Sequence, residues 1–203
     1  MEAVNSTSVL DWGVAARGLG GARESGDLHL VRETPEGMLL AVMDGLGHGP
    51  EAAVAARLCA SVLDEYANEG LDETIARCHV RLQGTRGVAI SMCFFQFSEA
   101  SWSWIGVGNV AGVLLRAGGK QREFLMQRSG VVGRRLPRVT VSRLRAEPED
   151  TLVLATDGIR ADFSHEMSLL GGPQQIAERI LGKHATGSDD ALALVARYPR
   201  GPA

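Results

Sequence analysis

Two segments of this chain, far apart in the sequence, each contain a short apolar run that ends abruptly in Asp-Gly. They are Met38–Gly45, which reads MLLAVMDG, and Thr151–Gly158, which reads TLVLATDG. An apolar run of this length is sufficient for a buried strand and too short for a typical helix. A third segment, Ser188–Asp190, places two Asp residues directly before the apolar run 191–196. Because strands of one sheet can bring such ends together, we expect the three acidic ends to meet at one sheet edge.

The chemistry of such a meeting point favours a metal ion. Carboxylates in a partly dry place repel each other unless they are protonated or neutralised by a cation. Oxygen ligands without His or Cys partners suit Mg²⁺, Mn²⁺ or Ca²⁺ better than zinc. The alternative is that each Asp-Gly pair serves turn geometry alone, but its recurrence and the Asp pair before a third run favour a functional site. The sequence therefore predicts a metal-dependent hydrolase.

The densest candidate for this site is the loop Asp44–Gly49, which reads DGLGHG. Its three glycines leave the backbone free to adopt positive φ and allow close approach to an ion or a phosphate. The carbonyl of Gly45 can then act as a neutral ligand beside the Asp44 carboxylate. His48 either faces the substrate or closes the loop through a hydrogen bond, and we favour the structural role. Asp27, which follows Ser-Gly before another apolar-rich strand, is a fourth candidate.

Composition and length restrict the class of protein. The 203 residues suit one domain, which we expect over residues 1–198 with a frayed tail at 199–203. A net charge of −3 argues against a general nucleic-acid-binding protein. Three Cys residues without a Cys-x-x-Cys pair favour reduced thiols in a cytoplasm over a disulfide framework. The N-terminus lacks a signal-peptide pattern and no apolar run approaches the ~20 residues that cross a bilayer, so we expect a cytoplasmic protein without a membrane partner.

Apolar periodicity and turn signals predict an α+β fold rather than a strict alternation of strands and helices. Helices are expected at 51–68, 72–82 and 174–181. Strands are expected at 10–17, 27–32, 38–43, 87–97, 101–107, 110–116, 122–126, 139–146, 151–155 and 191–197. Consecutive strands with helices in pairs are typical of layered folds with mostly antiparallel sheets. The chain has neither the glycine-rich dinucleotide fingerprint nor the P-loop pattern, which argues against a nucleotide-binding enzyme.

A basic region and the remaining nucleophiles carry weaker signals. Residues 116–145 hold eight Arg and one Lys against the single acid Glu123. These charges belong either to solvated strand faces and loops or to a docking surface for an acidic or phosphorylated protein, with Arg134, Arg135 and Arg138 as candidates. No Gly-x-Ser-x-Gly elbow is present and the Cys residues lie in apolar or helical contexts, so nucleophilic Ser and Cys receive little support.

Three motifs in this order closely resemble the signature of the metal-dependent type 2C Ser/Thr protein phosphatases, the PPM family. They are Asp44–Gly49, Ala155–Gly158 and Ser188–Asp190. Within that family the chain is similar to the bacterial SpoIIE branch, whose metal loop often reads Asp-Gly-Met-Gly-His-Gly. Motifs at 25–27, 83–87 and 107–110, together with the small size, resemble the stand-alone feedback phosphatases of the stressosome. The resemblance extends from Asp27 to Val195.

The resemblance implies a four-layer αββα sandwich, with two mostly antiparallel sheets between helical layers and two Mn²⁺ or Mg²⁺ ions at one end. By family position, Asp44 bridges the ions and the Gly45 carbonyl binds one of them, with Asp27 on that side directly or through water. Asp157 and Asp189 complete the shell of the other ion. Such ions lie about 3.5–4 Å apart and activate a water that attacks phosphorus in line without a phosphoenzyme. By this resemblance, catalysis depends on Asp44, Asp157 and Asp189 through the metal-activated water.

The chain departs from the family pattern near the phosphate-binding position. Eukaryotic relatives carry an Arg five positions before the first Asp, where this chain has Ala22, and whether the neighbouring Arg23 replaces it is open. Gly26 stands where those relatives often have Glu, which agrees with the SpoIIE branch. Asp190 falls where many relatives have Asn, and we give it a supporting role. We expect phosphate binding to depend on the metal ions and activity on small phosphoesters to be weak. Selectivity is expected to come from docking of the protein substrate.

The implied function is a phosphatase of phosphoserine or phosphothreonine in stressosome proteins of RsbS or RsbR type, as negative feedback in stress signalling. The next choice of substrate is an anti-sigma-factor antagonist. A rival from another class is a non-catalytic type 2C domain that binds phosphoproteins, although none of the metal-binding acids is lost. Another is an unrelated metallohydrolase such as a phosphodiesterase, against which the lack of a mixed His-Asp constellation counts. Nothing in the sequence suggests a coiled coil, so we expect a monomer.

Overall fold

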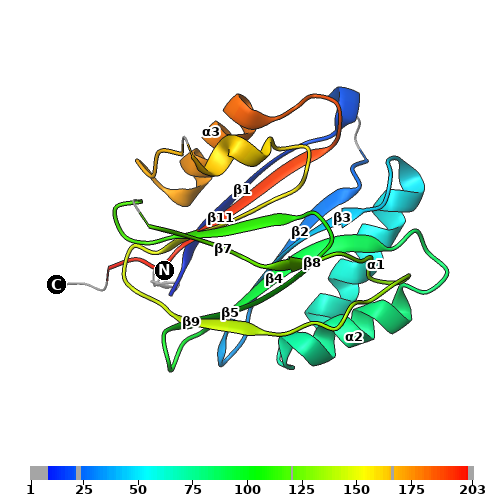
Figure 1. The fold of residues 1–203 in the computed structure, drawn as a ribbon, viewed down its shortest axis with the longest axis horizontal. Helices are drawn as coiled ribbons and strands as arrows, with labels where there is room; N and C mark the ends of the chain where they lie inside the picture. The colour runs from blue at the N-terminus through cyan, green and yellow to red at the C-terminus, as the bar shows by residue number, and fades with distance from the viewer. Residues whose placement is uncertain (1–8, 22–23, 120, 166, 201–203) are drawn as a thin grey trace, which may run out of the picture.

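The computed structural model describes residues 9–21, 24–119, 121–165 and 167–200, and it consists of two β-sheets packed face to face between helices (Figure 1). The predicted α+β sandwich with four layers is therefore confirmed. Residues 1–8 of the expected domain, the pair Ala22–Arg23 and the end of the expected tail lie outside the described residues. No described helix is both long enough and apolar enough to span a membrane.

The first sheet has five described strands, and every neighbouring pair in it is antiparallel. Its order is β1 (Asp11–Arg17), β11 (Ala191–Arg197), β10 (Thr151–Ala155), β6 (Ala111–Leu115) and β7 (Arg122–Phe124). The strands β10 and β11 are buried along almost their whole length. Both faces of these two strands are covered, which accounts for their unbroken apolar sequence.

The second sheet is mostly antiparallel as well. Its order is β2 (Asp27–Glu33), β3 (Gly37–Gly45), β4 (Val88–Gln96), β5 (Ser101–Val107) and β8 (Gln127–Arg128), while β9 (Ser142–Arg145) also pairs with β5. Only the short pairing of β5 with β8 is parallel among the described pairs. The strand β3 is buried over almost its whole length, as its apolar sequence predicts.

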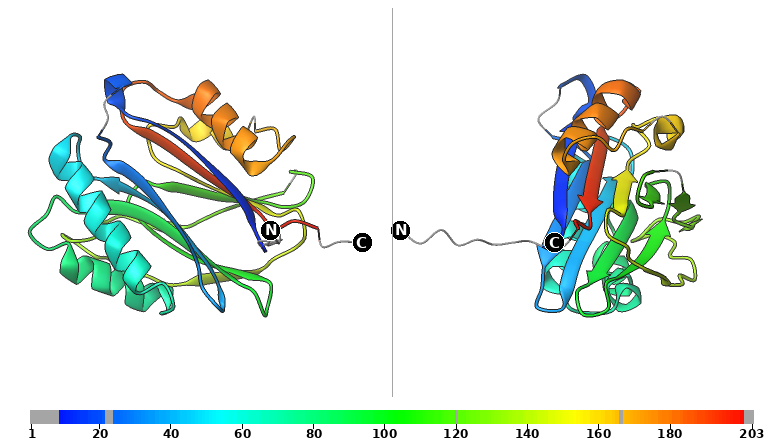
Figure 2. Two further views of the ribbon diagram at one scale, coloured as in Figure 1. Left: turned by 180° about the vertical axis from the view of Figure 1, so that it is seen from behind. Right: turned by 90° about the vertical axis from the view of Figure 1, so that its left-hand side faces the viewer.

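Helices cover the outer faces of both sheets, as the two views of Figure 2 show. The helices α1 (Pro50–Glu65) and α2 (Leu71–Arg81) lie on the second sheet, and α3 (Pro173–His184) lies on β1 and β11 of the first. Both α1 and α3 begin with Pro, whose fixed φ suits the first helical position. Two short 3₁₀ helices, Leu19–Gly21 and Ala161–Ser164, lie in the connections.

The buried apolar side chains form three clusters, one between the two sheets and one between each sheet and its helices. The layer between the two sheets contains the largest buried rings, with the centroids of Phe95 and Trp102 4.6 Å apart. A second layer joins α1 and α2 to the second sheet, and a third joins α3 to the first sheet. Because each sheet is buried on both faces over its central strands, the ends of those strands are held in fixed positions relative to one another.

The predicted boundaries need correction mainly after β5. The expected strand at 139–146 pairs only over Ser142–Arg145, and the one at 122–126 ends at Phe124. The strand Gln127–Arg128 and the 3₁₀ helix Ala161–Ser164 were not predicted. These elements lie at sheet edges or in connections, where few partners bury them and the apolar pattern is therefore weak.

A buried ion pair of the first sheet provides a stability test. The fully buried Asp150 accepts a hydrogen bond from Arg116 Nη1 at 2.7 Å, and Arg116 also contacts Glu123. We expect Arg116→Met to lower the free energy of unfolding by about 3 kcal/mol, because the Asp150 carboxylate stays buried without its cation. Urea unfolding measures this loss. The control is Arg32→Met, which breaks the exposed contact with Asp64 at 3.4 Å and should cost less than about 1 kcal/mol; equal losses in the two variants would contradict the account.

Candidate metal centre

Asp27 and Asp44 lie side by side at one end of the second sheet. Asp27 begins β2, Asp44 is the next-to-last residue of β3, and the antiparallel register places them directly opposite each other. Opposite residues of an antiparallel pair project from the same face of the sheet, about 5 Å apart. The Oδ2 atom of Asp27 accepts a hydrogen bond at 2.7 Å from the hydroxyl of Thr156, which directly follows β10 of the first sheet. The two acids therefore stand where the sheets meet.

Asp157 and Asp189 lie at the matching end of the first sheet. Asp157 comes two residues after β10 ends at Ala155, and Asp189 comes two residues before β11 begins at Ala191. Because Ala155 pairs with Ala193 in the antiparallel register, the end of β10 lies beside the start of β11. Both acidic side chains are exposed. The turns that follow β10 and precede β11 thus present two carboxylates to the same region.

The acidic ends do not share one sheet, and that expectation is wrong. The strand β3 belongs to the second sheet, whereas β10 and β11 belong to the first. The ends meet because the sheets face each other, with β3 against β10 and β2 against β11. An apolar run indicates that a strand is buried, but it does not indicate which strands lie beside it.

Burial and neighbouring carboxylates raise the pKa of three acids at this junction, Asp44, Asp27 and Asp157. Burial is the largest cause at Asp44, and the neighbouring carboxylates, with Asp27 first among them, add to it and raise its pKa to about 8. Burial also raises the pKa of Asp27 to about 7, against the opposing effect of the Thr156 hydrogen bond. Although Asp157 is largely exposed, partial desolvation of its carboxylate raises its pKa, and the charge of Asp189 raises it further. Ionising these carboxyl groups together is therefore unfavourable, and a divalent cation that offsets their charge would be stabilised at this junction.

The chemistry of the donors fits a hard cation. The acids and the Gly45 carbonyl supply oxygen atoms alone, and such ligands suit Mg²⁺ or Mn²⁺. Within the described ranges, no three His, Cys, Asp or Glu side chains converge closely enough to hold an ion by themselves. Mg²⁺ usually retains several waters and binds through only one or two carboxylates per ion, so carbonyl and water ligands can complete such a site.

Gly45 leaves no room for a side chain between β3 and α1. A Cβ atom at this position would stand 2.2 Å from the carbonyl oxygen of Ala52. The Gly45 N–H donates to the Gly26 carbonyl at 3.0 Å. This hydrogen bond joins the loop Asp44–Gly49, the candidate metal loop, to the segment before Asp27. Gly47 then adopts a φ of 84°, which favours glycine. Close packing and backbone conformation together explain why this loop is rich in glycine.

The three supporting candidates differ in what the structure says of them. Asp190 is buried, and its oxygens accept hydrogen bonds from the N–H groups of Leu19 at 2.7 Å and Gly26 at 2.6 Å. It therefore fastens the segment before β2 to the start of β11. His48 is exposed, and within the described ranges no hydrogen bond of its ring closes the loop. Arg23 lies outside the described residues.

Two further residues, Thr156 and Asn109, contact the acids and were not predicted as site residues. Thr156 donates to Asp27, as described above, and Asn109 Nδ2 donates to Asp157 Oδ2 at 2.6 Å. Asn109 lies in the turn between β5 and β6, within the Val-Gly-Asn-Val motif. That motif was the only sequence signal for Asn109. Neither contact could be predicted from local sequence, because each joins segments that are far apart in the chain.

Comparison with known proteins identifies the family of this chain. The chain matches the family model described as stage II sporulation protein E (SpoIIE) over residues 34–199. The phosphoserine phosphatase RsbX of Bacillus subtilis (strain 168) is 24% identical over 170 residues, which span 84% of this chain and 85% of that protein. The resemblance predicted from the sequence motifs is therefore confirmed.

Solved structures show the same fold. The structure of RsbX in complex with magnesium has a TM-score of 0.85 and 20% identity, and the match covers 97% of this chain and 99% of that one. A chain solved in work on the bacterial stressosome as a modular system adapted to secondary messenger signalling has a TM-score of 0.86 and 28% identity, over 94% of this chain and all of that one. Since the matched segment contains Asp44, Asp157 and Asp189 within a two-sheet sandwich, this chain belongs to the SpoIIE family of type 2C, metal-dependent protein phosphatases.

Proposed function

We propose that this phosphatase removes phosphate from phosphoserine or phosphothreonine in stressosome proteins of the RsbS and RsbR type, as negative feedback in stress signalling. The observation that carries the proposal is the meeting of the acidic ends of β3, β10 and β11 between the two sheets. The choice of substrate is supported by the similarity to RsbX and to the chain solved in work on the stressosome. A phosphorylated anti-sigma-factor antagonist is the second candidate substrate.

We further propose that the site holds two Mn²⁺ or Mg²⁺ ions per chain. Asp44 would bridge them, since acids from both sheets lie close enough to raise its pKa. The Gly45 carbonyl and Asp27 would serve one ion, and Asp157 and Asp189 the other. Such ions, when bound, lower the pKa of water so that hydroxide is available near neutral pH, and they offset negative charge on the phosphoryl oxygens.

The neighbouring side chains hold the acids in position. Thr156 fixes one oxygen of Asp27, and Asn109 fixes one oxygen of Asp157. Asp190 holds the backbone on which Asp27 is carried, through the N–H of Gly26. These contacts set the separation of the carboxylates before any ligand binds, so that little reorganisation is needed during the reaction.

Substrate binding is expected to depend on the ions and on protein docking. Neither Ala22 nor Arg23, at the position of the phosphate-binding Arg of eukaryotic relatives, lies within the described residues. A small phosphoester offers little beyond its phosphate, so we expect it to be a poor substrate compared with a phosphoprotein. We also propose that the enzyme acts as a monomer.

The contact between Asn109 and Asp157 provides a test of the metal site. We expect Asn109→Ala to raise the Mn²⁺ concentration that gives half-maximal phosphate release by about 10-fold, because Asp157 loses the donor that orients it. A Mn²⁺ titration of activity measures this change. The matched control is Asn68→Ala, which removes an exposed amide in the turn after α1 and should change nothing. An unaltered Mn²⁺ dependence in Asn109→Ala would show that the contact does not serve a metal.

A comparison of substrates tests the proposed pathway. Phosphate release is measured with Mn²⁺ and with EDTA from a phosphoserine RsbS-type protein, a phosphorylated anti-sigma-factor antagonist and a generic phosphopeptide. We expect metal-dependent release that is fastest from the stressosome protein. Release only from the generic peptide or the antagonist would support the phosphatase activity but reject stressosome proteins as the substrate. Metal binding without release from any of the three would favour the non-catalytic phosphoprotein-binding domain.

A further inference from the structure

A hollow of about 480 Å³ opens beside the candidate metal loop, between the start of α1 and the turn before β4. Its lining is Pro50, Glu51, Val54, Gly84, Thr85, Arg86 and Arg134. None of these residues belongs to the proposed metal site. The hollow combines two guanidinium groups, one carboxylate and an exposed apolar side chain.

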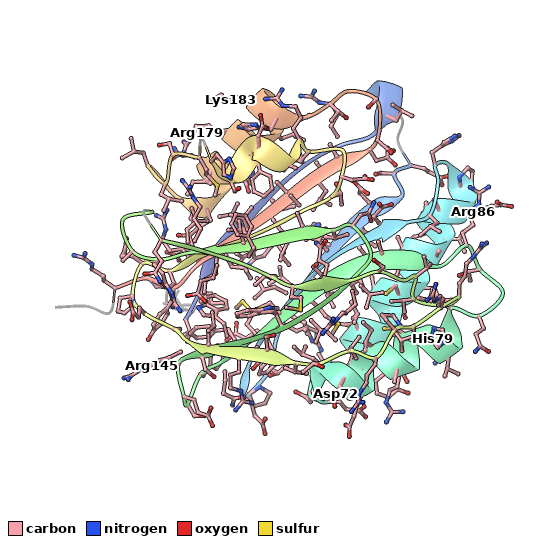
Figure 3. The ribbon with its side chains drawn as sticks, viewed as in Figure 1. Asp72, His79, Arg86, Arg145, Arg179 and Lys183 are labelled. Atoms are coloured by element: carbon pink, nitrogen blue, oxygen red, sulfur yellow. The ribbon has the colours of Figure 1, made fainter. Side chains whose placement is uncertain are left out.

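Arg86 lies against the loop that follows Asp44. The Leu46 N–H donates to the Gly87 carbonyl at 3.0 Å, which continues the pairing of β3 and β4 by one residue and places Arg86 opposite Gly47. A Cβ atom on Gly47 would come within 2.6 Å of Arg86 Nη1. Figure 3 labels Arg86 beside the start of α1. The guanidinium therefore covers the metal loop at its edge.

Glu51 positions this guanidinium from the first turn of α1. One oxygen of Glu51, Oε2, accepts a hydrogen bond from Arg86 Nε at 2.7 Å and forms an ion pair with Arg86 Nη2 at 2.6 Å. Both side chains are exposed, at 41% for Arg86 and 72% for Glu51. A pair this exposed contributes little to stability, so an incoming carboxylate can exchange with Glu51 at small cost.

Arg134 brings a second positive charge to the same hollow. Its loop is fastened to β4 by the reciprocal hydrogen bonds of Val132 with Val88, at 2.9 and 3.0 Å. The Arg134 side chain is exposed and makes no ion pair within the described ranges. Val54, which is 50% exposed, adds an apolar surface to the lining. The hollow thus has an excess of positive charge and room for a side chain.

We propose that Arg86 and Arg134 bind an acidic side chain of the protein substrate that lies three residues from its phosphoserine. This proposal rests on the phosphatase function proposed above. Asp44 pairs with Ala89, three residues from Arg86, so Asp44 and the hollow are about 10 Å apart along the strands. An extended peptide covers that distance in three residues, so a phosphoserine over Asp44 places a neighbouring acid at the two guanidinium groups.

Matched phosphopeptides test this inference. Two pairs of peptides carry phosphoserine and differ only in Glu or Gln at the third position, on the N-terminal side in one pair and on the C-terminal side in the other. For one pair we expect wild-type protein to favour Glu by about 10-fold in kcat/KM, because a carboxylate gains charge-assisted hydrogen bonds. In the double variant Arg86→Ala, Arg134→Ala we expect the Glu-to-Gln ratio to fall to about 1.

The control variant is Arg81→Ala. Arg81 is a similarly exposed arginine of α2 that contacts Glu65 of α1 at 3.7 Å, and its removal should leave the peptide preference unchanged. A ratio near 1 in the wild type for both pairs, or a preference that persists in the double variant, would overturn the proposal. If no phosphopeptide is hydrolysed, the phosphatase function fails instead, and fluorescence anisotropy of the labelled peptides then tests the hollow by the same ratio of affinities.

Discussion

Asp44→Asn is expected to reduce metal-dependent phosphate release by at least about 1000-fold while the protein remains folded. Asp44 is the proposed bridging ligand, and its charge is influenced by acids from both sheets. Asn keeps the size of the side chain but removes its negative charge, so the site loses the group that would hold both ions. Phosphate release from a phosphoserine peptide at saturating Mn²⁺ measures this loss, and near-UV circular dichroism checks the fold.

The matched control for this variant is Asp64→Asn. Asp64 is an exposed acid of α1 whose contact with Arg32, at 3.4 Å, lies on the surface. Its replacement should leave phosphate release within about 2-fold of the wild type, since exposed ion pairs contribute little. Activity of Asp44→Asn comparable to that of Asp64→Asn would show that Asp44 is not part of the catalytic centre.

The metal-free protein is expected to lose stability as the pH rises from about 4 to about 8. The pKa of Asp44 is raised to about 8 and that of Asp27 to about 7, from an ordinary value of 3.8 for each. The folded state therefore binds these protons more tightly than the unfolded state. The resulting contribution to the free energy of unfolding is fully present below the pKa of the unfolded state. It is lost as the pH rises through the pKa of the folded state. Since a tenfold change in proton affinity is worth about 1.4 kcal/mol, we expect a loss of about 2 kcal/mol or more.

Urea unfolding in EDTA at pH 5, 6, 7 and 8 measures this loss. Because other groups also titrate in that range, the difference between the wild type and Asp44→Asn isolates the contribution of Asp44. We expect the variant to be the more stable protein at pH 8, and Mg²⁺ to stabilise the wild type there but not the variant. Parallel stability curves for the two proteins would mean that Asp44 is not held in a buried, negatively charged site.

Much of the site could be predicted because each acid stands at the end of an apolar strand. The run before Asp44 and the run before Asp157 contain only residues that the two sheets bury, so the strands and their ends were both visible in the sequence. The Asp pair before β11 was visible for the same reason. Burial of a short strand and the chemistry of its terminal residue are local properties, which a sequence records directly.

Other parts of the arrangement depend on contacts between distant segments. The sequence did not indicate that β3 and β10 belong to different sheets, since strand pairing is decided by the whole fold. The hydroxyl of Thr156 meets Asp27 across 129 positions, and the amide of Asn109 meets Asp157 across 48. The hollow at Arg86 likewise joins three separate segments of the chain. Such positioning groups have no periodic pattern that would reveal them.

A calorimetric titration of Mn²⁺ into the metal-free protein tests the central claim most directly, because it counts the ions that the acids of the two sheets hold. We predict two ions per wild-type chain, loss of high-affinity binding in Asp44→Asn, and loss of one ion in Asp157→Asn with the fold retained. Absence of binding, or equal binding by the wild type and both variants, would contradict a metal centre between the sheets.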